Sequence, residues 1–173
     1  MDVFRIGLIG AGSIGTRHIK AIDELEHIEL VAVADPSPAA RALGDSRNIE
    51  VFADAESMLS ETDVEAVIIA TPTERHHADV MTALKYRKTV LVEKPITATM
   101  KEADEVTRYA AEQECQVLVG HQRRYYPCAR MARDIVRSGR IGRLMAVSGQ
   151  WAARKYDDYF AAAWRRDRKA GPI

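Results

Sequence analysis

The sequence predicts an α/β fold built on a doubly wound parallel sheet. Up to about residue 120, short runs rich in Val, Ile and Leu alternate with longer amphipathic stretches. Such continuous apolar runs are typical of strands covered on both faces, and their alternation with helices indicates βαβ units. A glycine-rich loop directly after the first apolar run is the second observation that favours this fold.

The apolar runs give the strands. We expect five of them, with a weaker candidate at Ile49–Phe52: Val3–Ile9, Glu29–Ala34, Ala66–Ala70, Thr89–Val92 and Gln116–Val119. The helix after the first strand has one apolar stripe, formed by Ile14, His18, Ile19, Ile22 and Leu25. The helix before the last strand has another, formed by Met100, Ala103, Val106 and Ala110.

The start of that later helix has its own signal. Thr99 and Glu102 have the spacing of a capping box, in which two side chains satisfy backbone N–H groups reciprocally. The pattern changes beyond residue 120, where Tyr125–Ser138 predicts a helix and Leu144–Trp151 a strand. We therefore place a domain boundary after residue 122 and assign 123–173 to a second, incomplete domain.

Composition excludes several classes of protein. Hydrophobic residues make up 47% of the 173, enough for a normal core. Lys+Arg and Asp+Glu are both 25, so the basic excess typical of nucleic-acid binders is missing. The two cysteines form no CxxC pair, which argues against a metal site, and no run approaches the ~18 apolar residues of a membrane span. We expect a cytoplasmic protein without metal or membrane partner.

The glycine loop predicts a phosphate site. Gly10, Gly12 and Gly15 have GxGxxG spacing between a strand and a helix, which is the context that this motif requires. Backbone N–H groups at the helix start, at Ser13 and Ile14, would face the phosphates of a dinucleotide. The alternative is a glycine-rich structural turn.

Asp35 predicts which dinucleotide binds. It ends the second strand, where a carboxylate accepts hydrogen bonds from the adenosine ribose hydroxyls and repels a 2′-phosphate. The nearest downstream arginine is Arg41, too far along the chain to be an obvious phosphate clamp. We therefore expect NAD in preference to NADP, although Asp35 could also serve as a turn former before Pro36.

Seven stretches occur in order along the chain: GLIGAGSIG, VAVADPSP, AVIIATPTERHH, VLVEKPITAT, VLVGHQRRYYP, SGRIGRL and AWRRDRKAGPI. Together they resemble the glucose–fructose oxidoreductase / inositol dehydrogenase / MocA (Gfo/Idh/MocA) family of NAD(P)-dependent oxidoreductases. The resemblance implies a Rossmann domain, followed here by the first elements of a truncated α/β substrate domain. It also implies hydride transfer between nicotinamide and a secondary alcohol or ketone of a sugar, cyclitol or similar polyol.

The resemblance also implies roles for the residues after the fourth and fifth strands. Thr71 and Pro72 match cofactor-lining positions, and Glu93 matches an acid that contacts the ribose near the nicotinamide. Lys94 matches the catalytic lysine that touches both cofactor and substrate, and the bond before Pro95 is commonly cis. The alternative for Lys94 is a solvated strand end.

Further roles follow from the same resemblance. His76 matches a histidine on the cofactor side, although a buried polar or helix-start role is the alternative. Gln122 matches a position near the nicotinamide. Arg124, Trp164 and Arg165 match positions on the substrate side.

This chain departs from the family pattern at two places. Arg87 stands where the family has a glycine at a helix end, which costs about 1 kcal/mol if the backbone is left-handed. The family's catalytic Asp and His, on one later helix, have no counterpart here. We therefore expect the 173 residues to bind cofactor without turnover and to form a homo-oligomer through the unpaired strand at 144–151. The alternative function is a non-catalytic dinucleotide-binding module or sensor.

Overall fold

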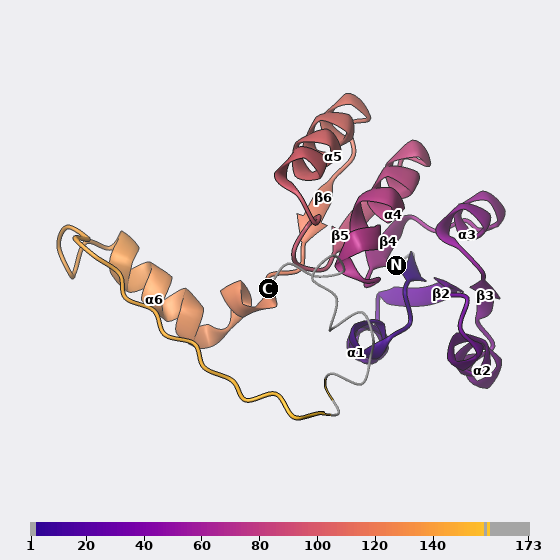
Figure 1. The fold of residues 1–173 in the computed structure, drawn as a ribbon, viewed down its shortest axis with the longest axis horizontal. Coiled ribbons are helices and arrows are strands. Elements are labelled where there is room, and N and C mark those ends of the chain that lie inside the picture. The colour runs from indigo at the N-terminus through magenta and orange to yellow at the C-terminus, as the bar shows by residue number, and fades with distance from the viewer. Residues whose placement is uncertain (1–2, 158, 160–173) are drawn as a thin grey trace. The chain divides into compact units, whose positions relative to one another are not determined.

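The computed structural model describes residues 3–157 and 159 (Figure 1). These residues divide into two units, one that ends at Gly120 and one that begins at His121. In chain order the elements are β1 Phe4–Ile9, α1 Ser13–Asp23, β2 Ile28–Ala34, α2 Pro38–Arg47, β3 Glu50–Phe52, α3 Ala55–Glu61, β4 Ala66–Ile69, α4 Thr73–Lys85, β5 Thr89–Val92, α5 Met100–Glu112, β6 Val117–Val119, the 3₁₀ helix η1 Gln122–Tyr125 and α6 Pro127–Arg137.

The first unit is a six-stranded sheet in the order β3-β2-β1-β4-β5-β6. All neighbouring strands are parallel, which confirms the doubly wound sheet predicted from the apolar runs. The chain runs outward from β1 to β3 and then returns to β4 on the other side of β1. In open α/β sheets, ligands bind outside the carboxyl ends of the strands at such a reversal.

The strands of this sheet end level with one another. The residue that follows each of five strands donates its backbone N–H to the last residue of the neighbouring strand. These bonds, each 2.8–2.9 Å long, are Asp35 to Phe52, Gly10 to Ala34, Ala70 to Ile9, Glu93 to Ile69 and Gly120 to Val92. The five loops that leave this edge therefore start in one row.

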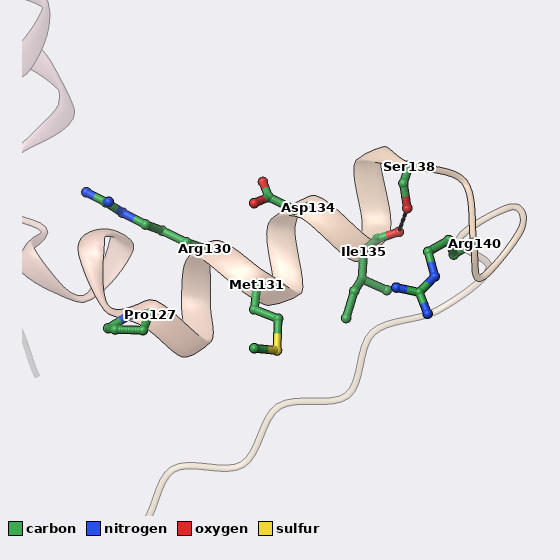
Figure 2. A pocket seen from close by; sticks show the side chains of 7 residues that line it. All are labelled: Pro127, Arg130, Met131, Asp134, Ile135, Ser138 and Arg140. Atoms are coloured by element: carbon green, nitrogen blue, oxygen red, sulfur yellow. Dashed lines mark hydrogen bonds between the residues drawn. The ribbon is translucent and has the colours of Figure 1, made fainter.

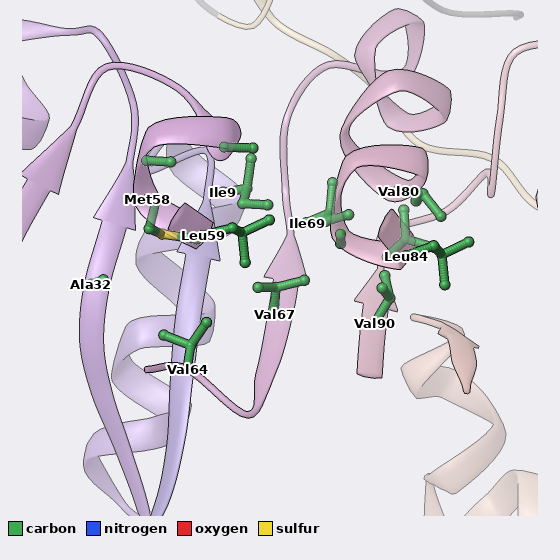
Figure 3. Close-up of a cluster of buried hydrophobic side chains, with 14 of the residues drawn as sticks. Ile9, Ala32, Met58, Leu59, Val64, Val67, Ile69, Val80, Leu84 and Val90 are labelled. Carbon is green, nitrogen blue, oxygen red and sulfur yellow. The ribbon is translucent and has the colours of Figure 1, made fainter. Parts of the chain in front are cut away.

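The two faces of the sheet are packed by different helices. On one face, α3 and α4 contribute Met58 and Leu84, both fully buried against strand residues such as Val67 and Ile69 (Figure 3). On the same face α5 contributes Val106, which is also fully buried. On the other face, α1 contributes Ile19 and Ile22, which pack against Leu8, Val33 and Ile68. Because successive strand side chains point to opposite faces, the apolar runs supply both cores at once.

The predicted helix stripes are confirmed only in part. Ile19 and Ile22 are buried, but Ile14 is 38% exposed and Leu25, half exposed, lies beyond the end of α1. On α5, Val106 and Ala110 are buried, whereas Met100, the first residue of the helix, is exposed. The capping box of Thr99 and Glu102 is present, with both reciprocal hydrogen bonds.

The second unit differs from the prediction in two respects. The helix predicted over Tyr125–Ser138 begins at Pro127, because proline suits the first helical position and makes Tyr126 before it extended. The strand predicted at Leu144–Trp151 is wrong, since these residues have no regular structure and are exposed. A strand needs a neighbour for its backbone groups, and no strand of the described residues pairs with it. The homo-oligomer stays a prediction.

A helix that spans a membrane must be long and apolar. Of the helices within residues 3–157, none is long and apolar enough to cross a bilayer.

The end of α4 has a left-handed residue at the position where the related family has glycine. Arg87 has φ 55°, and its N–H donates to the carbonyl of Leu84 (2.9 Å). The next N–H, of Lys88, donates to the carbonyl of Ala83 (3.0 Å). Together these bonds form a Schellman motif with arginine at the position where glycine is usual.

We predict that Arg87→Gly raises the free energy of unfolding by about 1 kcal/mol, because glycine has no Cβ to clash in the left-handed region. Lys85→Gly, at the last residue of α4, is the control and should lower it, because glycine is a weaker helix former than lysine. Urea unfolding followed by far-ultraviolet circular dichroism measures both. A loss of stability in Arg87→Gly would show that the arginine side chain contributes more than its backbone costs.

Candidate functional site

Two glycines of the loop after β1 make close contacts with neighbouring backbone. Gly10 has φ +92°, and a Cβ there would lie 2.8 Å from the Thr71 nitrogen. A Cβ on Gly15 would lie 2.0 Å from the carbonyl oxygen of Gly10. The first glycine is therefore needed for backbone conformation and the third for the contact between α1 and the loop.

Gly12 differs, because a Cβ built on it meets nothing within 4 Å. It is the N-cap of α1 and has no side chain to accept the free N–H groups of the first turn. The N–H groups of Ser13 and Ile14, both exposed residues, therefore remain for an external acceptor. This open helix start fits the pyrophosphate of a dinucleotide, which the helix dipole also favours.

Asp35 follows β2 and holds the glycine loop. Its Oδ2 accepts the N–H of Ala11 and its Oδ1 accepts the N–H of Ser37, both at 2.8 Å. Burial raises the pKa of Asp35, but these hydrogen bonds outweigh it and leave the pKa below its usual value. The carboxylate is therefore ionised at neutral pH, and each oxygen retains a lone pair for a ligand.

Arg75 is a residue of this site that sequence reasoning missed. It lies in the first turn of α4, where its guanidinium pairs with Asp79 at 3.2 Å. Its charge also lowers the pKa of Asp35, although this is the smallest of the contributions there. No local signal could have found it, because the two residues come together only when β2 and β4 flank β1.

His76 lies in the interior, with 1% of its surface exposed. Its Nε2 is 2.9 Å from the carbonyl oxygen of Thr71, and its Nδ1 is 2.7 Å from that of Pro95. The Thr71 hydroxyl donates to Asp79 at 2.8 Å, and Pro72 is the N-cap of α4. His76 therefore connects the loop after β4 to the turn after β5.

Glu93 follows β5 and contacts α1. Its Oε1 lies 3.1 Å from Nε2 of His18, and its Oε2 accepts the N–H of Lys94 at 3.2 Å. The hydrogen bond from His18 is the main cause that keeps the pKa of Glu93 below its usual value. Lys94 is exposed, and the peptide between Lys94 and Pro95 is cis, as the resemblance implied.

The predicted site residues of the first unit lie in loops at the carboxyl ends of the strands. The loops that begin with Gly10, Asp35, Ala70 and Glu93 leave neighbouring strands in the row described above. Gln122 and Arg124 are exposed residues of η1 in the second unit.

Two predicted substrate-side residues, Trp164 and Arg165, lie outside the described residues. Within the described ranges, no cluster of three or more His, Cys, Asp or Glu side chains could hold a metal ion.

A hollow in the second unit is a separate feature. It lies along α6 and the turn after it, and the close-up in Figure 2 shows Met131 and Ile135 on the helix with Arg140 beside them. None of the predicted site residues lines it. This hollow is open, and we assign no ligand to it.

Comparison with known proteins gives a consistent result. The family model described as "Oxidoreductase family, NAD-binding Rossmann fold" matches residues 4–121. The rhizopine catabolism protein MocA of Rhizobium meliloti is 35% identical over 152 residues, which cover 87% of this chain and 48% of that protein. Inositol 2-dehydrogenase of Rhizobium meliloti (strain 1021) is 32% identical, over 83% of this chain and 44% of that protein.

A solved structure agrees with these relatives. Scyllo-inositol dehydrogenase from Lactobacillus casei, crystallised with bound NAD(H) and scyllo-inositol, superposes with a TM-score of 0.77 at 28% identity. The match covers 82% of this chain and 43% of that one. The chain thus spans less than half the length of each of these three proteins.

We predict that His76→Ala lowers the free energy of unfolding by about 2–4 kcal/mol, because it opens a cavity at a buried position and removes the ring that bridges the Thr71 and Pro95 carbonyls. The control is His77→Ala on the same helix. His77 is 28% exposed and pairs with Glu105 at 3.1 Å, so its removal should cost less than about 1 kcal/mol. Equal losses in urea unfolding would contradict the bridging role of His76.

Proposed function

This chain belongs to the oxidoreductase family with the NAD-binding Rossmann fold (Gfo/Idh/MocA), and we propose that it binds NAD for a dehydrogenase reaction on a polyol. The observation that supports this most directly is the row of loops at one sheet edge. It combines an open helix start at Gly12 with ionised carboxylates at Asp35 and Glu93. A dinucleotide offers phosphates to the first and ribose hydroxyls to the other two.

In this proposal each group of the chain has one task. The N–H groups of Ser13 and Ile14 bind the pyrophosphate, with Gly12 leaving room for it. Asp35 accepts the hydroxyls of the adenosine ribose, and Glu93 those of the ribose next to the nicotinamide.

The loop after β4 completes the cofactor side. Thr71 and Pro72 line the cofactor, and the buried His76 supports this loop through the Thr71 carbonyl. We assign Gln122 to the nicotinamide end of the cofactor. Arg124, Trp164 and Arg165 are assigned to the substrate side.

Lys94 carries the chemical step in the proposal. Bound NAD would exchange a hydride with the carbon of a secondary alcohol. Lys94 is exposed at the carboxyl end of β5, so its ammonium can reach a substrate oxygen. There it would stabilise the negative charge that develops on that oxygen as the carbon gives its hydride to NAD and the hydroxyl proton passes to a general base of the whole protein.

The substrate class is proposed from the relatives. One is named inositol 2-dehydrogenase, and the structural neighbour holds scyllo-inositol. We therefore propose a cyclitol, a sugar or a similar polyol as substrate, and the reaction as a proposal for the whole protein.

A second candidate function is an NAD-binding module without turnover. The observation that favours it concerns His18 and His76, two histidines that contact the loops of this row. His18 is engaged with Glu93, and His76 with two carbonyl oxygens, so neither is free to accept the hydroxyl proton. NADH binding without oxidation of any polyol or sugar in a panel would support this candidate.

We predict that the chain binds NADH more tightly than NADPH, because the ionised Asp35 repels a 2′-phosphate. Asp35→Ala should weaken NADH binding by about 1–3 kcal/mol. Since Asp35 also holds the glycine loop, the sharper variant is Asp35→Asn, which keeps an acceptor and removes the charge. The dissociation constant of NADPH divided by that of NADH should fall about tenfold in this variant, because Arg75 then attracts the 2′-phosphate without an opposing carboxylate.

Calorimetry with both nucleotides measures these constants. Asp45→Asn, an exposed acid of α2, is the matched control and should leave the ratio unchanged. Tighter binding of NADPH to the unaltered chain would contradict the proposed specificity, and no binding of either nucleotide would contradict the proposed function.

We predict that Lys94→Met, in a preparation of the protein that turns over a polyol, lowers kcat about 100-fold or more and changes NADH affinity by less than about twofold. Lys101→Met removes an equal charge from an exposed position of α5 and should change neither value. Stopped-flow absorbance of the nicotinamide measures the hydride step. Activity that survives within a factor of a few would show that Lys94 is a solvated strand end.

A further inference from the structure

His18 contacts the acid of the Glu93-Lys94-Pro95 turn from a different element. It lies on α1, one turn beyond Gly15, and its Nε2 is 3.1 Å from Oε1 of Glu93. The two side chains are largely covered, with 22% and 17% of their surface exposed. On the sequence pattern alone, His18 belongs to the apolar stripe that packs α1 on the sheet.

The Glu93 carboxylate is also held by its own turn. Its Oε2 accepts the backbone N–H of Lys94 at 3.2 Å. The two oxygens of this carboxylate are therefore engaged by two different elements, Oε1 by α1 and Oε2 by the turn after β5.

The bond from His18 has a specific chemical effect. A ring N–H that donates to a carboxylate forms a charge-assisted hydrogen bond, which is stronger than a neutral one. It favours the ionised acid and fixes which oxygen faces α1. The same bond joins the helix that follows the glycine loop to the turn that carries Lys94.

We propose that His18 is a positioning residue for the cofactor site, which orients the Glu93 carboxylate toward a ribose hydroxyl and couples α1 to the turn that carries Lys94. This inference rests on the proposed NAD site. It assigns to His18 a role that acts through Glu93, beyond the packing of α1.

Two substitutions of His18 separate these roles. His18→Gln places an amide N–H near the position of Nε2, whereas His18→Met fills a similar volume without a donor. We expect His18→Met to weaken NADH binding about 5- to 10-fold, because the Glu93 carboxylate is then no longer held in one orientation, and His18→Gln to restore it to within about twofold. His27→Met, at an exposed histidine before β2, is the matched control and should bind NADH like the unaltered chain.

The Glu93→Gln background tests whether His18 acts through Glu93. There His18→Met should weaken NADH binding by no more than about twofold further, because the acid that it positions is already gone. The ¹³C signal of the Glu93 carboxyl supplies a readout without nucleotide. Its apparent pKa should rise in His18→Met and stay low in His18→Gln.

The outcomes are distinct for the two proposals. If the unaltered chain binds no NADH, the proposed function is wrong. If it binds NADH and His18→Met binds equally well, or loses as much affinity in the Glu93→Gln background, the positioning role is overturned. An unchanged Glu93 pKa in His18→Met would also overturn it.

Discussion

The backbone ladder that runs one residue past the strand ends is the constraint on which the site depends. Five of the six strands each fix the first loop residue of a neighbouring strand through one hydrogen bond of 2.8–2.9 Å. These bonds are part of a buried parallel sheet, in which an unpaired backbone group would be costly. The loops therefore cannot shift along the strand direction independently. The core that orders the strands also orders the residues that face a ligand.

The acids at this edge serve both the fold and the ligand. Asp35 accepts the N–H of Ala11 just before α1, and Glu93 contacts His18 within α1. The first helix is thus bound to the sheet edge at two places by the carboxylates that are proposed to bind ribose hydroxyls. A carboxylate has lone pairs for both partners, so the two roles do not compete. Replacement of either acid removes a structural contact together with a ligand contact, which is why variants that keep an acceptor are more informative.

The sequence predicted the parts of this site that depend on neighbours in the chain. The strand ends could be predicted because the apolar runs stop at Gly10, Asp35 and Glu93. The turn after the first strand could be predicted because the spacing of its glycines is a local signal. Arg75 and the bond from His18 to Glu93 were missed because they join elements that meet only in the folded sheet. The strand predicted at Leu144–Trp151 failed for a related reason. Its residues suit a strand, but the pairing partner that a strand requires is a property of the fold and not of the segment.

Because the strands end at the same level, the strand spacing also sets how far apart the loops of Asp35 and Glu93 begin. Asp35 and Glu93 begin loops on β2 and β5, and β1 and β4 lie between these strands. Neighbouring strands are about 4.8 Å apart, so the two acids begin about 14 Å from each other along the edge. A molecule that contacts both acids must therefore extend past the loops after β1 and β4, as a dinucleotide in an extended conformation does. The spacing of the strands therefore favours extended ligands over compact ones, whatever the chemistry of the side chains.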